Sequence, residues 1–167
     1  MAPFGAIYLD TNVFVIGFEA KGEVSELLSQ IFNKIDERRD ARLVTSEPTL
    51  SELLGRPIRE NDEFTVAQYE GLISPGTWLE VFPMARRALT AAATLRAQSL
   101  GLKLPDAIHI ATAIRANCSR VLTGDLGSKG TYSLTSRMMP MDPSPEPLTV
   151  IRPDEPTLTS LLQSLAA

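Results

Sequence analysis

The chain has 167 residues, of which 44% are hydrophobic and 22% charged, the usual balance for a single soluble globular domain. It has no apolar stretch long enough to cross a membrane, no signal-peptide pattern at its N-terminus and only one cysteine, so a cytoplasmic protein without disulfides is expected. Its net charge of −4 is unfavourable for a nucleic-acid binder that depends on bulk positive charge.

The first part of the chain alternates strand-like and helical segments. An apolar run at residues 5–9 predicts a buried strand, which leads into a loop after Asp10. Apolar residues then recur at the spacing of an amphipathic helix: Val24, Leu27, Leu28, Ile31 and Ile35. A short strand is expected at residues 42–45. The next helix would be capped by Ser46 and would end near residues 55–57, where glycine and proline interrupt it.

The same alternation continues in the second part. A helix is possible at residues 63–70, and a strand is expected at 78–82. Two further helical stripes follow: Ala85, Ala88, Leu89, Ala92 and Leu95, and then Ala107, Ile110, Ala111 and Ile114. Strands are expected at 120–123 and 148–151. About five strands separated by helices predict a central parallel sheet covered on both faces, which is a three-layer α/β/α sandwich.

The C-terminal part has a different composition. Six prolines between residues 140 and 156 predict an extended segment, and leucines at residues 158–165 predict a short terminal helix. We therefore expect one domain at residues 1–152 and a tail at 153–167. The tail either docks on the domain or contacts a partner.

Four acidic residues occupy positions that would suit a metal site. Asp10 and Asp125 each end an apolar strand-like run, Asp106 begins a helix directly after Pro105, and Glu52 faces away from the apolar side of its helix. Parallel sheets carry their sites beyond the carboxyl ends of the strands, where these four carboxylates would meet. Each residue also has a simpler interpretation as a cap, a turn or a surface residue, so the prediction depends on their combination.

Grouped carboxylates favour one kind of chemistry. Mg²⁺ and Mn²⁺ prefer oxygen ligands, and one or two such ions promote phosphodiester hydrolysis. Other designs have less support, because Cys118 has no paired ligand for zinc and His109 has no nucleophile arrangement nearby. His109 is therefore interpreted as a structural histidine. Local basic residues would bind a phosphate backbone: Arg86, Arg87, Arg96, Lys103, Lys129 and Arg137.

Four segments carry a family resemblance in the same order along the chain. They are Ile7–Val13, Thr49–Leu54, Leu104–Ala113 and Val121–Asp125, each containing one of the four acids. Together they resemble the PIN-domain nucleases, most closely the VapC-like toxins of type II toxin–antitoxin systems, from about residue 7 to about residue 151. The segment after Asp125, residues 126–131, departs from the acidic or aromatic loop of that family.

The resemblance implies a metal-dependent endoribonuclease that uses Mg²⁺ or Mn²⁺. Carried over position by position, it makes Asp10, Glu52, Asp106 and Asp125 the catalytic metal-binding acids, with Asn12 and Thr123 supporting the site. It also implies an RNA substrate, a homodimer and a cognate antitoxin that fills the groove near the acids. Two alternatives remain open: a PIN-like module that binds RNA or protein without cutting, and a housekeeping RNA-processing nuclease.

Overall fold

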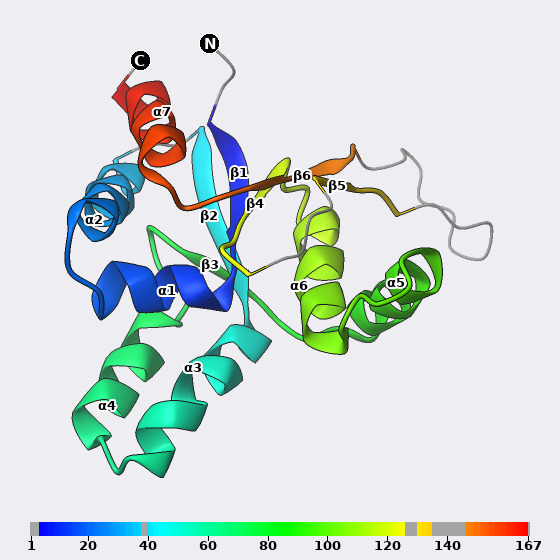
Figure 1. Cartoon of the computed structure of the whole chain (residues 1–167), viewed down its shortest axis with the longest axis horizontal. Coiled ribbons are helices and arrows are strands. Elements are labelled where there is room, and N and C mark those ends of the chain that lie inside the picture. The colour runs from blue at the N-terminus through cyan, green and yellow to red at the C-terminus, as the bar shows by residue number, and fades with distance from the viewer. Residues whose placement is uncertain (1–3, 38–39, 126–129, 135–145, 167) are drawn as a thin grey trace.

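The protein is described from a computed structural model, in which residues 4–37, 40–125, 130–134 and 146–166 are described (Figure 1). Its strands are β1 (Gly5–Leu9), β2 (Ala41–Ser46), β3 (Glu80–Phe82), β4 (Arg120–Leu122), β5 (Thr131–Tyr132) and β6 (Leu148–Ile151). Its helices are α1 (Thr11–Phe18), α2 (Glu23–Ile35), α3 (Glu47–Arg59), α4 (Glu63–Leu72), α5 (Arg86–Gln98), α6 (Leu104–Arg115) and α7 (Glu155–Ala166).

The six strands form one sheet in the order β3-β2-β1-β4-β6-β5. Neighbouring strands pair in parallel, except that β5 runs antiparallel to β6. β1 lies between β2 and β4, and Leu9 is in register with Leu122. Because the strands are parallel, the carboxyl ends of β1, β2 and β4 meet at one edge of the sheet.

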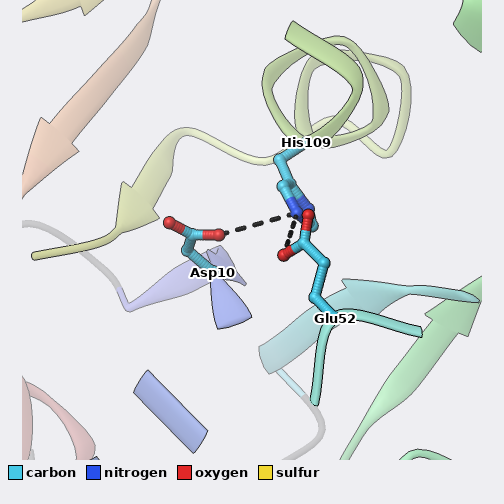
Figure 2. A group of neighbouring side chains, drawn as sticks. All are labelled: Asp10, Glu52 and His109. Atoms are coloured by element: carbon cyan, nitrogen blue, oxygen red, sulfur yellow. Dashed lines mark hydrogen bonds and ion pairs between the residues drawn. The ribbon is translucent and has the colours of Figure 1, made fainter. Parts of the chain in front are cut away.

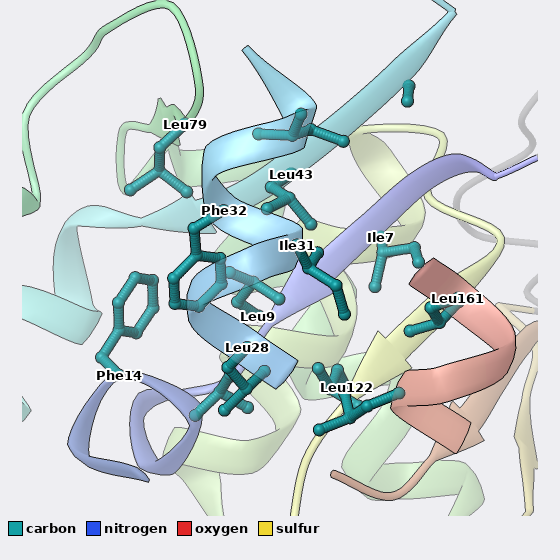
Figure 3. Packing of buried hydrophobic residues seen from close by; sticks show 14 of the residues in the cluster. Ile7, Leu9, Phe14, Leu28, Ile31, Phe32, Leu43, Leu79, Leu122 and Leu161 are labelled. Atoms are coloured by element: carbon teal, nitrogen blue, oxygen red, sulfur yellow. The ribbon is translucent and has the colours of Figure 1, made fainter. Parts of the chain in front are cut away.

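Helices cover both faces of the sheet, and the side chains of β1 alternate between them. Ile7 and Leu9 pack into the cluster formed by α1, α2 and α7, as Figure 3 shows. Ala6 and Tyr8 belong to the second cluster, with α5 and α6. The three-layer α/β/α sandwich expected from the sequence is confirmed, with seven helices among the described residues flanking the sheet.

The predicted sheet was incomplete at one edge. The short antiparallel strand β5 was missed, so within the described ranges the sheet has six strands rather than about five and is not wholly parallel. A two-residue strand is too short to produce an alternating pattern in the sequence. β3 is also shorter than expected, since it begins at Glu80 rather than at Trp78.

Two helices differ from the prediction. The segment after Asp10 is not a loop but α1, which Asp10 caps by accepting a hydrogen bond from the Thr11 backbone N–H. α3 does not end near residues 55–57 but continues to Arg59, with Pro57 inside it. An interior proline removes one helical hydrogen bond, and here its ring is buried against the rest of the domain, which compensates for part of that loss.

Ser46 also has a different role from the one predicted. It is the N-cap residue of α3, but its side chain makes no capping hydrogen bond. Its hydroxyl oxygen instead lies 2.6 Å from the hydroxyl oxygen of Tyr8, inside the protein. A buried tyrosine hydroxyl needs a partner, and Ser46 provides one at the cost of the cap.

The terminal helix α7 packs against α2 and begins at Glu155, with Pro156 in its first turn. Leu158, Leu161 and Leu165 are buried in the same cluster as the side chains of β1 and α2. Of the proline-rich segment, residues 140–145 lie outside the described part of the chain. Among the helices of the described residues, none combines the length and the apolar character that crossing a bilayer requires.

The burial of α7 leads to a prediction about stability. Leu158→Ala leaves a cavity beside α2 and should lower the free energy of unfolding by about 2–5 kcal/mol. The control Gln163→Ala, on the exposed side of the same helix, should change it by no more than about 0.5 kcal/mol. Urea unfolding measures both values. Equal effects of the two substitutions would contradict the assignment of α7 to the domain core.

Candidate functional site

Asp10 is the centre of the candidate site and follows directly from the pairing of β1 with β4. It is 7% exposed, and both of its carboxylate oxygens are held. The Thr11 backbone N–H donates to Oδ1 at 2.7 Å, and the Thr123 hydroxyl donates to Oδ2 at 2.6 Å. Thr123 reaches Asp10 because Leu9 and Leu122, the residues before them, are in register. The carboxylate is therefore fixed in position while keeping lone pairs for another group.

Glu52 reaches the same place from α3. Its side chain is 36% exposed, and its Oε2 accepts hydrogen bonds from the Thr11 hydroxyl and, at 3.2 Å, from His109 Nε2. Burial raises the pKa of Glu52, but these two hydrogen bonds outweigh it and lower the pKa overall. The glutamate that the helical pattern placed on the surface is thus turned towards Asp10 as a carboxylate.

His109 comes from α6 and completes the group (Figure 2). Its ring is only 2% exposed, and Nδ1 lies 2.7 Å from the hydroxyl of Tyr8. Nε2 faces the acids, 3.2 Å from Oε2 of Glu52 and 3.7 Å from Oδ1 of Asp10. Burial lowers the pKa of His109, but the bond with Glu52 and the negative charges of Asp10, Glu52 and Asp106 raise it overall.

Asp106 lies in the first turn of α6, one turn before His109, and is half-buried. Burial and the negative charge of Asp10 raise its pKa, while the positive groups of His109 and Lys103 oppose that change. The effect of the Asp10 charge on Asp106 places the two carboxylates within electrostatic reach of each other. Asp106 is nevertheless not part of the tight group of ligand atoms formed by Asp10, Glu52 and His109.

Asp125 lies at the rim of the site. Its side chain is exposed, and its backbone N–H donates to the hydroxyl of Thr123 at 3.2 Å. Thr123 therefore links Asp125 to Asp10 through one intermediate hydroxyl. Of the four predicted acids, the structure brings Asp10 and Glu52 together, places Asp106 nearby and leaves Asp125 at the periphery.

Asn12, expected to support the site, packs against the backbone beside Asp125. A β-carbon at Gly124 would lie 2.6 Å from Asn12 Nδ2, so the absence of a side chain at Gly124 permits this close approach. Among the described residues, Asn12 Oδ1 is the buried side-chain atom that has no hydrogen-bond partner. Such an oxygen is costly to bury and remains available to another donor or to a cation.

The site fits a divalent cation by the chemistry of its donors. One ligand atom each from Asp10, Glu52 and His109 lies within 4.8 Å of the other two. Carboxylate oxygens and imidazole nitrogen are ordinary protein ligands for divalent ions, and a cation would also offset the repulsion between neighbouring carboxylates. The arrangement is therefore able to bind an ion at the edge of the sheet and to present it to an incoming anion.

The sequence interpretation of His109 missed its contacts with the acids. His109 follows Asp106 by three residues, which places both on the same face of a helix. That spacing was available in the sequence, but His109 also sits within an apolar stripe, where a structural role is the usual interpretation. Thr11 and Tyr8 were missed as well, because their contacts are with residues distant in the sequence.

A separate apolar hollow of about 320 Å³ lies between α1 and α4. Phe18 and Trp78 line it, and Phe18 is 49% exposed. One wall is polar, because Glu19 accepts hydrogen bonds from Tyr69 and Arg56. An adjoining hollow of about 390 Å³ shares Phe18, Leu72 and Trp78. The exposed aromatic side chains make this hollow a second region of the domain where an apolar segment of another chain could be buried.

Comparison with known proteins identifies related folds. The structure resembles VapBC2 from Rickettsia felis bound to a promoter DNA fragment, with a TM-score of 0.57 and 16% identity, covering 71% of this chain and 86% of that one. It resembles Mycobacterium tuberculosis VapC20, a Sarcin-Ricin loop cleaving toxin, with a TM-score of 0.54 and 14% identity. This match covers 69% of the present chain and 86% of VapC20. A toxin–antitoxin complex from Klebsiella pneumoniae gives a TM-score of 0.50 and 19% identity, covering 70% and 84%.

A search of curated proteins finds no significant match to this sequence. Comparison with protein-family models gives a match to the PIN domain over residues 7–130. This range is well over half of the chain and includes all four predicted acids. The structural resemblances show the same fold, and the PIN-domain resemblance of the sequence is confirmed. The chain therefore belongs to the PIN domain family, a family of nucleases.

Proposed function

We propose that this protein is a metal-dependent endoribonuclease and the toxin of a toxin–antitoxin pair. The observation that carries the proposal is the convergence of Asp10 and Glu52 at the carboxyl edge of the sheet, with Asp106 within electrostatic reach, in a chain of a nuclease family. Asp10 is buried with both oxygens fixed, and Glu52 is turned towards it from another helix. Building such a cluster is costly unless a cation is bound there.

Asp10, Glu52 and Asp106 are the residues that would hold Mg²⁺ or Mn²⁺, with Asp125 as a peripheral ligand. A divalent ion at this position supplies an activated water and stabilises the leaving oxygen of a phosphodiester. The protein contributes rigidity. Thr11 and Thr123 hold Asp10, while Thr11 and His109 hold Glu52 in the carboxylate form. The raised pKa of Asp106 also supports cation binding, because a cation would relieve its repulsion by Asp10.

RNA binding has to overcome a net charge of −4. Lys103 is the residue immediately before α6, within electrostatic reach of Asp106, and Arg86 and Arg87 are exposed at the start of α5. Lys129 and Arg137, also predicted to contact phosphate, lie outside the described residues. A bound cation together with such local basic groups would attract the RNA backbone in spite of the overall charge.

The antitoxin proposal rests on two kinds of support. Two of the structurally similar proteins are VapBC2 from Rickettsia felis and a toxin–antitoxin complex from Klebsiella pneumoniae. In the present chain, the hollow lined by Phe18 and Trp78 offers an apolar surface on which a helical or extended segment of a partner would be buried. We also propose that the protein forms a homodimer and acts in the cytoplasm.

The first prediction from the proposed function concerns catalysis. The purified chain should cut a structured RNA pool with Mn²⁺ or Mg²⁺ and not with EDTA. Asp10→Asn and Glu52→Gln should each reduce the rate by about 100-fold or more, because losing several kcal/mol of transition-state stabilisation has that effect. Glu60→Gln, at the far end of α3, is the matched control and should cut like the native chain. RNA binding without cleavage by any form would favour the non-catalytic module.

The second prediction concerns Asp125. Asp125→Asn should keep the cleavage rate within about tenfold of the native rate, since the carboxylate is exposed and reaches Asp10 only through Thr123. Single-turnover cleavage under the same conditions measures the difference from Asp10→Asn. A loss as large as that of Asp10→Asn would mean that Asp125 is a principal ligand.

The third prediction separates a toxin from a housekeeping nuclease. Induced expression of the native chain should arrest bacterial growth, Asp10→Asn should not, and co-expression of the small protein encoded beside it should restore growth. Phe18→Asp should weaken copurification of that neighbour by placing a charge in the apolar hollow. RNA cleavage without growth arrest or complex formation would instead indicate a housekeeping enzyme.

A further inference from the structure

We propose that Nε2 of His109 is a direct ligand of the metal centre, so that the site is a mixed oxygen and nitrogen site that prefers Mn²⁺ to Mg²⁺. This inference rests on the metal centre of the proposed function and does not depend on RNA being the substrate. It makes His109 a residue of the site itself, in place of the structural role that its position in an apolar stripe indicates.

The distances around Nε2 match those between neighbouring ligands of one ion. Nε2 lies 3.2 Å from Glu52 Oε2 and 3.7 Å from Asp10 Oδ1, and the three atoms are within 4.8 Å of one another. Adjacent ligands bound at about 2.1 Å are separated by about 3.0 Å in octahedral geometry and about 3.4 Å in tetrahedral geometry. Only small side-chain shifts would bring all three atoms onto one ion.

Hydrogen bonding alone does not account for both carboxylates beside this nitrogen. Nε2 carries at most one hydrogen, which is used in the 3.2 Å bond to Glu52. The separation of 3.7 Å from Asp10 is too long for a second hydrogen bond. A cation that replaces the hydrogen on Nε2, with the proton released to solvent, would bind Asp10, Glu52 and His109 at once.

The ring is already oriented for this role. Nδ1 lies 2.7 Å from the hydroxyl of Tyr8, which in turn lies 2.6 Å from the hydroxyl of Ser46, and all three groups are buried. Histidines that bind metals usually donate their second ring N–H to an oxygen, which fixes the tautomer and the direction of the free nitrogen. Figure 2 shows the ring of His109 directed at Asp10 and Glu52.

The helix that carries His109 also carries Asp106 three residues earlier. Carboxylate and histidine ligands at this spacing share one face of a helix, an arrangement used in metal-binding helix bundles. Mg²⁺ demands oxygen ligands and gives up its waters reluctantly, whereas Mn²⁺ and later first-row ions bind more strongly to mixed nitrogen and oxygen sites. The nitrogen is therefore expected to bias the site against Mg²⁺.

The chain offers a clean spectroscopic test because His109 is its only histidine. In untagged protein loaded with Mn²⁺, pulsed electron paramagnetic resonance should show ¹⁴N modulation from a coordinated imidazole. His109→Gln should remove that modulation, and Glu60→Gln should leave it unchanged. A bound Mn²⁺ without imidazole modulation in the native chain, or no Mn²⁺ binding at millimolar concentration, would overturn the proposal.

Competition between the two ions gives the second measurement. His109→Gln should lower the affinity for Mn²⁺ by about tenfold or more while changing that for Mg²⁺ less, and circular dichroism would check that the variant is folded. Equal losses for both ions would overturn the selectivity. Imidazole modulation without any RNA cleavage would retain this inference and reject the proposed function. Metal-dependent cleavage without the modulation would do the reverse.

Discussion

The parallel pairing of β1 with β2 and β4 is the constraint on which the rest of the site depends. Leu9 is in register with Leu122, so the residues that follow them, Asp10 and Thr123, lie side by side and form a 2.6 Å hydrogen bond. The hydrophobic core enforces this register. A slip of one residue would exchange the two faces of β1 and move Ile7 and Leu9 away from the α2 and α7 layer.

The same alternation explains why one histidine on α6 meets a residue of β1, the residue that follows β1, and a residue of α3. Tyr8 and Asp10 are two residues apart, so both lie towards the α6 side of the sheet. His109 meets Tyr8 with Nδ1 and approaches Asp10 with Nε2, while Glu52 reaches Nε2 from α3. Figure 2 shows Asp10, Glu52 and His109 meeting at this point. The site therefore joins the sheet to both α3 and α6, and its geometry is set by the packing of those layers.

Electrostatics decides what such a site is able to do. Burial and neighbouring carboxylates raise the pKa of Asp106, whereas hydrogen bonds lower that of Glu52 despite its partial burial. The acids therefore differ in their environments. Hydrogen-bond donors favour the ionised form of Glu52, whereas Asp106 lies near the like charge of Asp10. A cation would balance both conditions, which supports the metal centre proposed above for a chain whose net charge is −4.

The sequence by itself determined the layered α/β/α fold and the positions of the acids along the chain. A helix with strong apolar periodicity, such as α2, is predictable from the sequence because its apolar face must be buried in any tertiary arrangement. Short elements were less predictable: α1 has eight residues and β5 has two, and contacts with the rest of the domain decide their structure. The continuation of α3 through Pro57 is of the same kind, since burial outweighs a local preference.

Only the tertiary structure decided which acids meet and what joins them. Asp10 and Glu52 are brought together by the packing of α3 against α1 and β2, whereas Asp125 faces solvent although its strand-end pattern is as clear as that of Asp10. His109 gains its role from Tyr8, 101 residues away in the sequence, and from Glu52, 57 residues away. The physical reason is that periodicity reports which face of an element is buried, while the partners across that face depend on how the layers pack.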